Sequence, residues 1–574
     1  MNSKAQSLIQ SLDANALAHP SKLAFKYVGK PSGTLNDLTF AELGDATRWV
    51  AAELLHRPVR PVKAVLLYPQ CLDFIVAFMA CLRAGVVAVP LSLPINRQDQ
   101  TRFLSVLDDC DPDLVLTVSA IEAMPEVQML KQLRPDMQWV SSDLITNASE
   151  HRDLPGGHCP PDGDELAFLQ YTSGSTGMPK GVMVSHANIM SNQRMITAAF
   201  QNTPEDSVAS WLPLFHDMGL IGGILQPIYL GMSCYLMSPF DFLQKPLRWL
   251  QAISEYGATV SGGPNFAYEL CVRKINEEDL AGLDLSRWRL AFNGAEPVRA
   301  ATLRAFTEAF APVGFDHRTH FPCYGLAEGT LFVSGGPSVE LPVFLTVDAE
   351  EMETLRAVPS TAGRPLHELV GSGIAADGLR VVAADPETRL PLPTSMVGEI
   401  WVSGPSIATG YWKKAQATQE TFEARLLGDG RAYLRTGDLG FLTEAGEVVI
   451  TGRVKDLIIV RGRNYYPHDI EAIAERAHPA VRTGSAAAFV AREEEGVWVL
   501  VEIRKDALES ADLAEVKASV RTLINQEAGL VVGGVTLLEP GKVSKTTSGK
   551  VRRQDCRTRL LEGKLKDLAE TRPV

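Results

Sequence analysis

The sequence lacks the features that mark zinc-binding, membrane-spanning and exported proteins. Its eight cysteines show no C-x-x-C spacing and no cluster with histidine of the kind that zinc needs. Its most apolar region, residues 64–93, is interrupted by Gln70, Asp73, Arg83 and two prolines, which argues against a span of about 20 residues in lipid. The N-terminus has no continuous apolar stretch like that of a secretory signal. We therefore expect a cytoplasmic protein with buried, reduced thiols and no membrane span.

Positive charge is also in short supply. The 574 residues include 55 Lys and Arg against 68 Asp and Glu, a formal net charge of −13. Because nucleic-acid binding usually needs a basic surface, no nucleic-acid partner is expected. The exception is residues 541–574, whose ten basic and four acidic side chains give a charge of +6. This segment is a candidate docking surface for an acidic partner, and attraction of phosphate explains it equally well.

What the sequence does contain is the pattern of an α/β protein with more than one domain. A chain of this length exceeds what one hydrophobic core usually supports. Apolar runs at 64–68, 86–91, 114–118 and 166–171 alternate with helical patterns such as 72–85. This alternation predicts buried parallel strands joined by crossover helices. The predicted fold class is therefore α/β.

Two changes in composition suggest where the chain divides. The Pro/Gly-rich stretch 154–164 is expected to separate two α/β blocks. Near residue 452 the pattern changes to a short strand, a turn and a helix, which begins a unit of roughly 120 residues, a common domain size. We therefore place a large N-terminal α/β domain of several subdomains at residues 1–454 and a smaller C-terminal α+β domain at residues 455–574.

The strongest chemical signal is the run YTSGSTGMPKG at residues 171–181. An apolar strand leads there into a turn rich in glycine and hydroxyl groups, whose backbone N–H groups can converge on an anion. Lys180 adds positive charge, but it lies three residues after Gly177, so the run is not a Walker A loop. The residues predicted to bind phosphate are Thr172, Ser173, Gly174, Ser175, Thr176, Gly177 and Lys180.

With this loop the sequence resembles the adenylate-forming superfamily of acyl-CoA synthetases, peptide-synthetase adenylation domains and luciferases. The likeness covers essentially the whole chain. The further motifs, in the family's order, are FNGAEP (292–297), YGLAE (324–328), GEIWVSG (398–404), TGDLG (436–440), GRVKDLIIVRGRNYYPHDIE (452–471) and SKTTSGKVRR (544–553). The resemblance implies ATP and Mg²⁺ as cofactors.

The resemblance also assigns residues around the adenine base. Asn293, Gly294 and Ala295 form a run small enough for the adenine ring to pack flat against the backbone, although a tight turn explains the same run. Tyr324, followed by Gly325, can stack on the base.

The ribose and the metal ion have candidate ligands of their own. Glu328 offers hard oxygen ligands suited to Mg²⁺, although a lone glutamate is more often a solvated surface residue. Asp438 offers two acceptors for the ribose hydroxyls, and Arg453 resembles the second ribose contact. An aspartate near two glycines is otherwise an ordinary turn former.

Two catalytic residues and a hinge are implied in the same way. His216 matches the family position beside the reacting carboxylate and the α-phosphate, although such a histidine alone is more often packed or capping. Lys550 matches the catalytic lysine, because an ammonium can neutralise charge that develops on the α-phosphate. Lys455 falls where the family places its interdomain hinge, so the C-terminal domain is expected to be mobile.

Two features resemble one branch of the superfamily, the fatty acyl-AMP ligases. One is the run LPLFHDMGLIGGILQP at residues 212–227. The other is a long segment after Glu328 with an insertion at about residues 345–370. In that branch the insertion is thought to hinder the use of CoA, so the acyl group passes to the phosphopantetheine of an acyl carrier protein. A surface loop with no effect on the acceptor is the alternative.

The expected function is therefore activation of a fatty acid with ATP to fatty acyl-AMP and pyrophosphate, followed by transfer to an acyl carrier protein. Glycines would leave room for an alkyl tunnel, or would serve close packing, at Gly219, Gly222, Gly223, Gly262 and Gly263. Three alternatives stay open: a fatty acyl-CoA synthetase, an amino-acid-adenylating enzyme, which Asp217 would suit, and a non-catalytic nucleotide-binding module.

Overall fold

The computed structural model describes residues 7–30, 33–95, 97–172, 179–336, 341–361, 366–460, 463–492, 496–545 and 550–571. No helix within these ranges is long and apolar enough to cross a lipid bilayer. All eight cysteines are free thiols and six are buried, but Cys159 is exposed, so the expectation of buried thiols fails for that residue.

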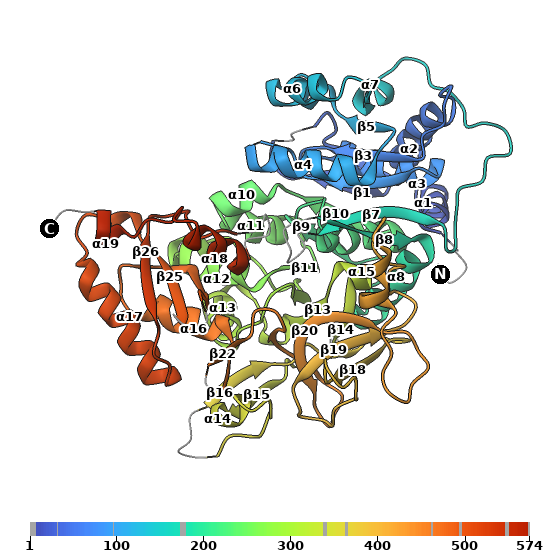
Figure 1. The fold of residues 1–574 in the computed structure, drawn as a ribbon. Coiled ribbons are helices and arrows are strands. Elements are labelled where there is room, and N and C mark those ends of the chain that lie inside the picture. The colour runs from blue at the N-terminus through green and yellow to red at the C-terminus, as the bar shows by residue number, and fades with distance from the viewer. Residues whose placement is uncertain are drawn as a thin grey trace.

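A six-stranded sheet is built from strands within residues 63–185 (Figure 1). Its order is β6-β5-β3-β4-β7-β8, and its strands pair in parallel except for the hairpin of β7 and β8. Its strands are β3 (Lys63–Leu67), β4 (Val87–Leu91), β5 (Leu114–Thr117), β6 (Gln138–Ser141), β7 (Leu166–Thr172) and β8 (Lys180–Ser185). The crossover helices are α3 (Leu72–Ala84) and α4 (Arg97–Cys110). Every residue of α3 is buried, which explains why its sequence is apolar all round and confirms the predicted strand, helix and strand.

A nine-stranded sheet follows, in the order β17-β14-β13-β12-β11-β9-β10-β1-β2. Its strands are β1 (Leu23–Tyr27), β2 (Asp37–Thr39), β9 (Ser207–Ser210), β10 (Ser233–Leu236), β11 (Val260–Gly263), β12 (Leu290–Asn293), β13 (His320–Gly325), β14 (Phe332–Gly335) and β17 (Ile374–Ala375). Helices of this part include α8 (His186–Phe200), α11 (Leu247–Tyr256), α12 (Asn265–Lys274) and α13 (Ala300–Phe310). Strands β9 to β13 are mutually parallel, so their carboxyl ends meet at one edge.

The prediction that residues 154–164 separate two α/β blocks is wrong. Strand β7, which follows this stretch, pairs with β4 inside the six-stranded sheet. The chain passes to the nine-stranded sheet only after α8. Proline and glycine mark an irregular surface connection, but they carry no information on which sheet the next strand joins.

Two smaller sheets complete the large domain. One is antiparallel and contains β18 (Arg380–Ala384), β19 (Gly398–Ser403), β20 (Leu434–Leu442) and β21 (Val448–Arg453). The other is the hairpin of β15 (Phe344–Asp348) and β16 (Leu366–Val370), with the short helix α14 (Ala349–Met352) between its strands. This hairpin occupies the predicted insertion. Other helices are α1 (Leu8–Ala18), α2 (Phe40–Leu55), α5 (Ser119–Glu122), α6 (Pro125–Leu133), α7 (Ser142–Thr146), the π-helix η1 (Met218–Leu225), α9 (Gln226–Leu230), α10 (Pro239–Gln244) and α15 (Ala415–Phe422).

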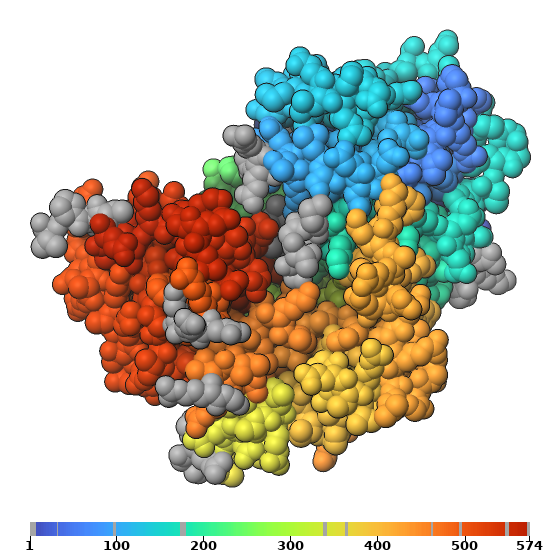
Figure 2. All heavy atoms as spheres, in the orientation of Figure 1, coloured from blue at the N-terminus to red at the C-terminus, as the bar shows by residue number. Residues whose placement is uncertain are grey.

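The C-terminal part has a hydrophobic core of its own, drawn from residues between Ile458 and Leu568. Its strands are β22 (Ile458–Val460), β23 (Arg463–Tyr465), β24 (Val481–Val490), β25 (Val497–Ile503) and β26 (Gly534–Leu538). Its helices are α16 (Pro467–Arg476), α17 (Leu513–Ala528), α18 (Arg553–Leu561) and α19 (Leu568–Thr571). Figure 2 shows this part, in orange to red, set against the rest of the molecule with a hollow between them. The predicted α/β class with a smaller C-terminal domain is confirmed.

Candidate active site

A cavity of about 2340 Å³ lies between the large domain and the C-terminal domain. The residues that follow strands β9, β11, β12 and β13 line it, so the cavity sits at the carboxyl ends of parallel strands. Ligands of open α/β sheets bind at this edge. The C-terminal domain contributes the wall from Lys550 to Asp555.

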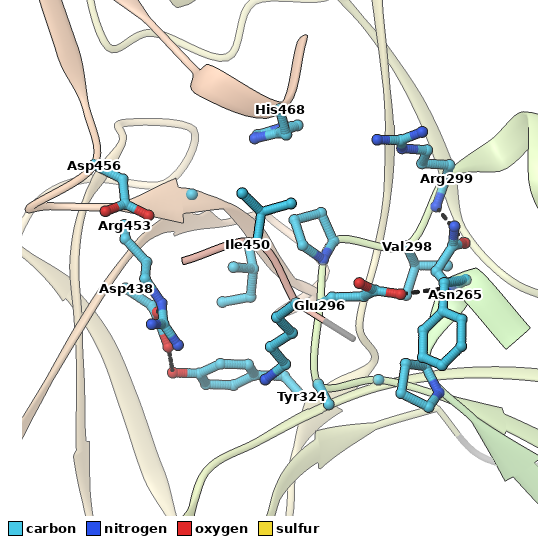
Figure 3. A pocket seen from close by; sticks show the side chains of 18 of the residues that line it. Asn265, Glu296, Val298, Arg299, Tyr324, Asp438, Ile450, Arg453, Asp456 and His468 are labelled. Atoms are coloured by element: carbon cyan, nitrogen blue, oxygen red, sulfur yellow. Dashed lines mark hydrogen bonds and ion pairs between the residues drawn. The ribbon is translucent and has the colours of Figure 1, made fainter. Parts of the chain in front are cut away.

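Tyr324, Asp438 and Arg453 form one hydrogen-bonded group on the cavity wall (Figure 3). The Tyr324 hydroxyl donates to Asp438 Oδ2 at 2.7 Å, and Arg453 Nε donates to Asp438 Oδ1 at 3.2 Å. The register of β20 and β21 sets Asp438 opposite Arg453, which explains why residues 15 positions apart meet. The nearby Asp438 carboxylate raises the pKa of Arg453. The sequence predicted these three residues as nucleotide contacts, and the structure brings them together.

Glu328 is held by a residue that the sequence did not reveal. The Tyr411 hydroxyl donates to Glu328 Oε1 at 2.8 Å, and the Lys180 ammonium lies 4.6 Å from the centre of the Tyr411 ring. Burial, and then the charges of Asp217 and Asp438, raise the pKa of Glu328. A bound cation would offset that cost, so the donor set fits Mg²⁺.

The further ligands of a metal ion at Glu328 would have to be groups other than protein side chains. No group of three metal-ligating side chains occurs among the described ranges of the chain. Mg²⁺ usually keeps one or two carboxylates together with phosphate oxygens and water, so a single glutamate matches a metal ion that arrives with a nucleotide.

Lys550 enters the cavity among acidic side chains of the large domain. Burial lowers its pKa, as does the charge of Arg453, while Asp217, Glu296 and Asp438 raise it. His216 lies close enough that the charges of Lys550 and Arg102, after burial, lower its pKa to about 4. His216 is therefore neutral at physiological pH. Both predicted catalytic residues line the same cavity.

The adenine-binding run divides between the cavity and the core. Gly294 and Ala295 line the cavity, and Ala295 has a φ of 71°, a left-handed conformation that alanine rarely adopts. Asn293 is fully buried and is absent from the cavity wall, and neither polar atom of its amide has a hydrogen-bond partner in the described part of the chain. Gly325 lines the cavity where an added Cβ would lie 1.9 Å from the Leu331 carbonyl oxygen, so only glycine fits there.

The predicted phosphate loop is described only at its two ends. Thr172 and Lys180 pair across β7 and β8, and both line the cavity. Five residues predicted to bind phosphate lie outside the described residues: Ser173, Gly174, Ser175, Thr176 and Gly177.

Lys455 lines the cavity two residues after Arg453, at the start of the C-terminal domain. The next residue, Asp456, accepts a hydrogen bond from Arg553 Nη1 at 2.9 Å, and Arg553 also pairs with Glu471 at 2.7 Å. Arg553 is thus a structural cation of the basic terminal segment and ties α18 to the hinge region and to α16. The hinge itself stays a prediction.

The insertion contacts both domains. Towards the large domain, Glu368 pairs with Arg304 of α13 at 2.7 Å. Towards the C-terminal domain, His367 Nε2 lies 3.1 Å from Asp469 Oδ2, and Asn464 Nδ2 donates to the Glu353 carbonyl oxygen at 2.8 Å. The insertion therefore bridges the two domains.

The five glycines predicted to border an alkyl tunnel have two different roles. An added Cβ would lie 2.1 Å from the Phe292 carbonyl oxygen at Gly262 and 2.6 Å from the Trp211 ring at Gly263, so close packing explains both. Gly223 is also packed, 3.0 Å from Ser210 Oγ. Gly219 and Gly222 line the cavity, and Gly222 has the more open surroundings. Apolar residues that line the cavity include Ile196, Phe200, Val208, Trp211, Phe266 and Leu270.

Proteins that match this chain are enzymes that form adenylates. Residues 12–412 match the AMP-binding enzyme family, and residues 455–570 match the AMP domain of the Disco-interacting protein 2-like family. The chain is 40% identical to the medium-chain-fatty-acid–[acyl-carrier-protein] ligase JamA of Moorena producens, over 97% of this chain and 95% of that protein.

Solved structures share the fold over nearly the whole length. A structure from work on the fatty acyl-adenylate ligases of E. coli and L. pneumophila gives a TM-score of 0.88 at 33% identity and covers 98% of this chain and 99% of the other. The L. pneumophila fatty acyl-adenylate ligase in complex with acyl adenylate and pyrophosphate gives 0.75 at 37% identity, covering 99% and 98%. The chain therefore belongs to the AMP-binding enzyme family and, within it, to the fatty acyl-AMP ligases.

Proposed function

We propose that this protein activates a fatty acid with ATP to fatty acyl-AMP and pyrophosphate, and then transfers the acyl group to the phosphopantetheine thiol of an acyl carrier protein. The observation that carries the proposal is one cavity lined by the Tyr324, Asp438 and Arg453 group, by Lys550 and by apolar side chains. The names of the relatives agree, since JamA is a fatty-acid–[acyl-carrier-protein] ligase.

The nucleotide would lie along the polar wall of the cavity. Asp438 and Arg453 would bind the ribose, Tyr324 and the Gly294–Ala295 backbone would hold the adenine, and Thr172 and Lys180 would face the phosphates. Glu328 would hold Mg²⁺ together with phosphate oxygens, and the bound ion would neutralise negative charge on the polyphosphate.

The chemical step needs positioning and charge neutralisation and no base. A fatty carboxylate is ionised at neutral pH. One of its oxygens attacks the α-phosphorus, the bond from that phosphorus to the bridging oxygen breaks, and the electron pair leaves with pyrophosphate. Lys550 would neutralise the charge that develops on the α-phosphate oxygens. Neutral His216 can orient a carboxylate or phosphate oxygen by donating a hydrogen bond.

A fatty acid suits the acyl end of the site better than an amino acid does. Asp217, the residue that would pair with an amino group, accepts a hydrogen bond from Met218 N at 2.8 Å and caps the η1 helix. The negative charge of Asp217 also raises the pKa of Lys550. The chain therefore supplies its own cation near the Asp217 carboxylate. Apolar side chains such as Trp211 and Phe266 line the same cavity as Asp217.

The first experiment is ATP–pyrophosphate exchange with a series of unbranched fatty acids and the 20 standard amino acids. We expect exchange with fatty acids only. Exchange that depends on an amino acid and not on any fatty acid would overturn the substrate class, and ATP binding without exchange would reduce the protein to a nucleotide-binding module.

The second experiment offers CoA and a phosphopantetheine-loaded carrier protein to the enzyme in competition. We expect acylation of the carrier to dominate, because the insertion ties the C-terminal domain to the large domain through His367 and Asn464. Efficient formation of acyl-CoA would instead assign the protein as a fatty acyl-CoA synthetase.

A further inference from the structure

Two arginines on the cavity wall have no acidic partner among the described residues. Arg102 lies on α4 of the large domain and Arg552 lies at the start of α18 of the C-terminal domain, and both line the cavity. Neither guanidinium makes an ion pair or a hydrogen bond to any side chain in the described ranges. Other cations of the basic terminal segment do pair with carboxylates, as Arg553 does with Asp456 and Glu471 and Lys564 does with Glu562.

The two guanidinium groups lie close enough to repel each other. Burial, and then the charge of Arg552, lower the pKa of Arg102, and Asp99 on the same helix only partly offsets this. Two like charges brought together from different domains destabilise that arrangement unless an anion lies between them.

Their place in the cavity indicates which anion this is. Arg102 lines a small side pocket together with His216 and Tyr171, and Tyr171 directly precedes Thr172, the first predicted phosphate contact. Arg552 follows Lys550 by two residues. The positive charges of Lys550 and Arg102 both lower the pKa of His216. The positive charge of Arg552 in turn lowers the pKa of Arg102. Arg102 therefore borders the predicted phosphate contact, and Arg552 belongs to the same segment as the predicted catalytic lysine.

We propose that Arg102 and Arg552 form a two-domain clamp that binds the pyrophosphate leaving group. The inference rests on the proposed function, because it assigns the β- and γ-phosphates of ATP to this end of the cavity. Guanidinium groups bind phosphate through paired, charge-assisted hydrogen bonds, so two of them can hold both phosphates of pyrophosphate.

The clamp has a consequence for the order of the two half-reactions. Arg552 belongs to the same segment as Lys550. A movement of the C-terminal domain that withdraws Lys550 from the cavity therefore withdraws Arg552 as well. Pyrophosphate would then be held by Arg102 alone in the large domain and would dissociate. Release of the leaving group is thereby tied to the domain movement that admits the carrier thiol.

The test is the reverse reaction, in which a pyrophosphate oxygen attacks the α-phosphorus of the acyl adenylate and the carboxylate leaves with the electron pair. We expect Arg102→Met and Arg552→Met each to raise the KM for pyrophosphate about tenfold, with a smaller effect on kcat. Arg102→Lys and Arg552→Lys should recover part of the loss, because they keep the charge but lose the paired hydrogen bonds.

Two controls separate the clamp from a general loss of structure. Arg559→Met removes a charge from the same helix at a residue that does not line the cavity, and it should leave the KM for pyrophosphate unchanged. Transfer from preformed acyl adenylate to the carrier should stay within about twofold of wild type in Arg102→Met, which lies outside the basic segment 541–574, because that step involves no pyrophosphate.

The clamp is overturned if the KM for pyrophosphate in both methionine variants equals that of Arg559→Met, or if acyl transfer falls in parallel in Arg102→Met. Calorimetric titration of magnesium pyrophosphate into the protein gives a readout that needs no turnover. Weaker binding in both variants supports the clamp, and equal binding contradicts it. Absence of exchange with any fatty acid in the wild type would count against the proposed function and leaves this titration to decide the clamp.

Discussion

Single residues determine the chemistry, and Lys550 is the residue whose role can be tested most directly. It comes from the C-terminal domain and lies among Asp217, Glu296 and Asp438 of the large domain. We expect Lys550→Ala to slow ATP–pyrophosphate exchange by about 100-fold or more, because the charge on the α-phosphate would lose its main protein counter-charge. Transfer from preformed acyl adenylate should be much less affected. Exchange at the wild-type rate would remove Lys550 from the catalytic machinery.

A second prediction concerns Asp438. Its two oxygens accept from Tyr324 and Arg453, so an amide at this position would face the arginine with one oxygen fewer. We expect Asp438→Asn to raise the KM for ATP by about tenfold or more, since charge-assisted bonds are lost and the ribose contact weakens. Steady-state kinetics at saturating fatty acid measure this. Tyr324→Phe is the milder comparison, because it keeps the ring and the carboxylate. An unchanged KM for ATP in Asp438→Asn would contradict the assignment.

Most of the predicted site residues lie in short motifs, which made the resemblance recognisable. Tyr324, Glu328 and Asp438 could be identified from local patterns, and the structure places them on one cavity wall. Tyr411 could not, since its link to Glu328 spans 83 positions and lies in no motif. Arg102 lies in no motif either, and Arg552 lies in SKTTSGKVRR, where only Lys550 was given a role. The side chain of Asn293 turns into the core, which the motif did not reveal, and its place in the adenine site stays a prediction.

Among the elements, glycines in strand and helix give a matched pair of predictions. Gly262 lies in β11, and an added Cβ would lie 2.1 Å from the Phe292 carbonyl oxygen of the neighbouring strand. We expect Gly262→Ala to lower the free energy of unfolding by about 3 kcal/mol or more. Urea denaturation measures this.

Gly222 has room for a methyl group, because the nearest atom, a Leu331 methyl, would lie 3.6 Å from an added Cβ. We expect Gly222→Ala to fold with equal or slightly higher stability, since alanine favours helix by about 1 kcal/mol over glycine. The bulkier Gly222→Val should shift the preferred fatty acid towards shorter chains, because this residue lines the cavity. An unchanged chain-length profile in ATP–pyrophosphate exchange would place the alkyl group elsewhere.

The insertion is an element whose role can be tested directly. We expect the double variant His367→Ala, Asn464→Ala to raise acylation of CoA relative to the carrier by about 3- to 10-fold, because it removes two side-chain contacts between the insertion and the C-terminal domain. Arg304→Ala is the matched control, since it breaks the contact of the insertion with the large domain instead. The same acceptor ratio in both variants would reduce the insertion to a surface loop.

Local patterns predicted the elements better than their assembly. The apolar runs became β3, β4, β5 and β7, because a strand buried on both faces has a continuous apolar sequence. The same runs do not indicate which strands pair with each other. Residues 154–164 were therefore predicted to separate two blocks, whereas β7, which follows them, pairs with β4 in the same sheet. Likewise β1 and β2 precede the six-stranded sheet in sequence but belong to the nine-stranded sheet.

At the scale of the whole molecule, buried histidines set the response to acid. Burial lowers the pKa of His186 and of His320 to about 4. In the unfolded chain both take up a proton below about pH 6.5, whereas in the folded protein they do so only near pH 4. The free energy of unfolding should therefore fall as the pH drops from 6.5 to 4, by on the order of 3 kcal/mol for each histidine. Urea titrations at several pH values check this, and a flatter pH slope is expected for His186→Gln. If the free energy of unfolding falls equally steeply with pH in the wild type and in His186→Gln, the lowered pKa of His186 is contradicted.

The claim on which all of these rest is that the two domains together form a fatty acyl adenylate. The direct measurement is incubation of the purified protein with a fatty acid and ATP labelled at the α-phosphate, followed by separation of the products and addition of loaded carrier protein. The account predicts a labelled lipid bound to AMP that disappears as the carrier becomes acylated. If no fatty acid of any chain length yields a labelled adenylate, the account is wrong.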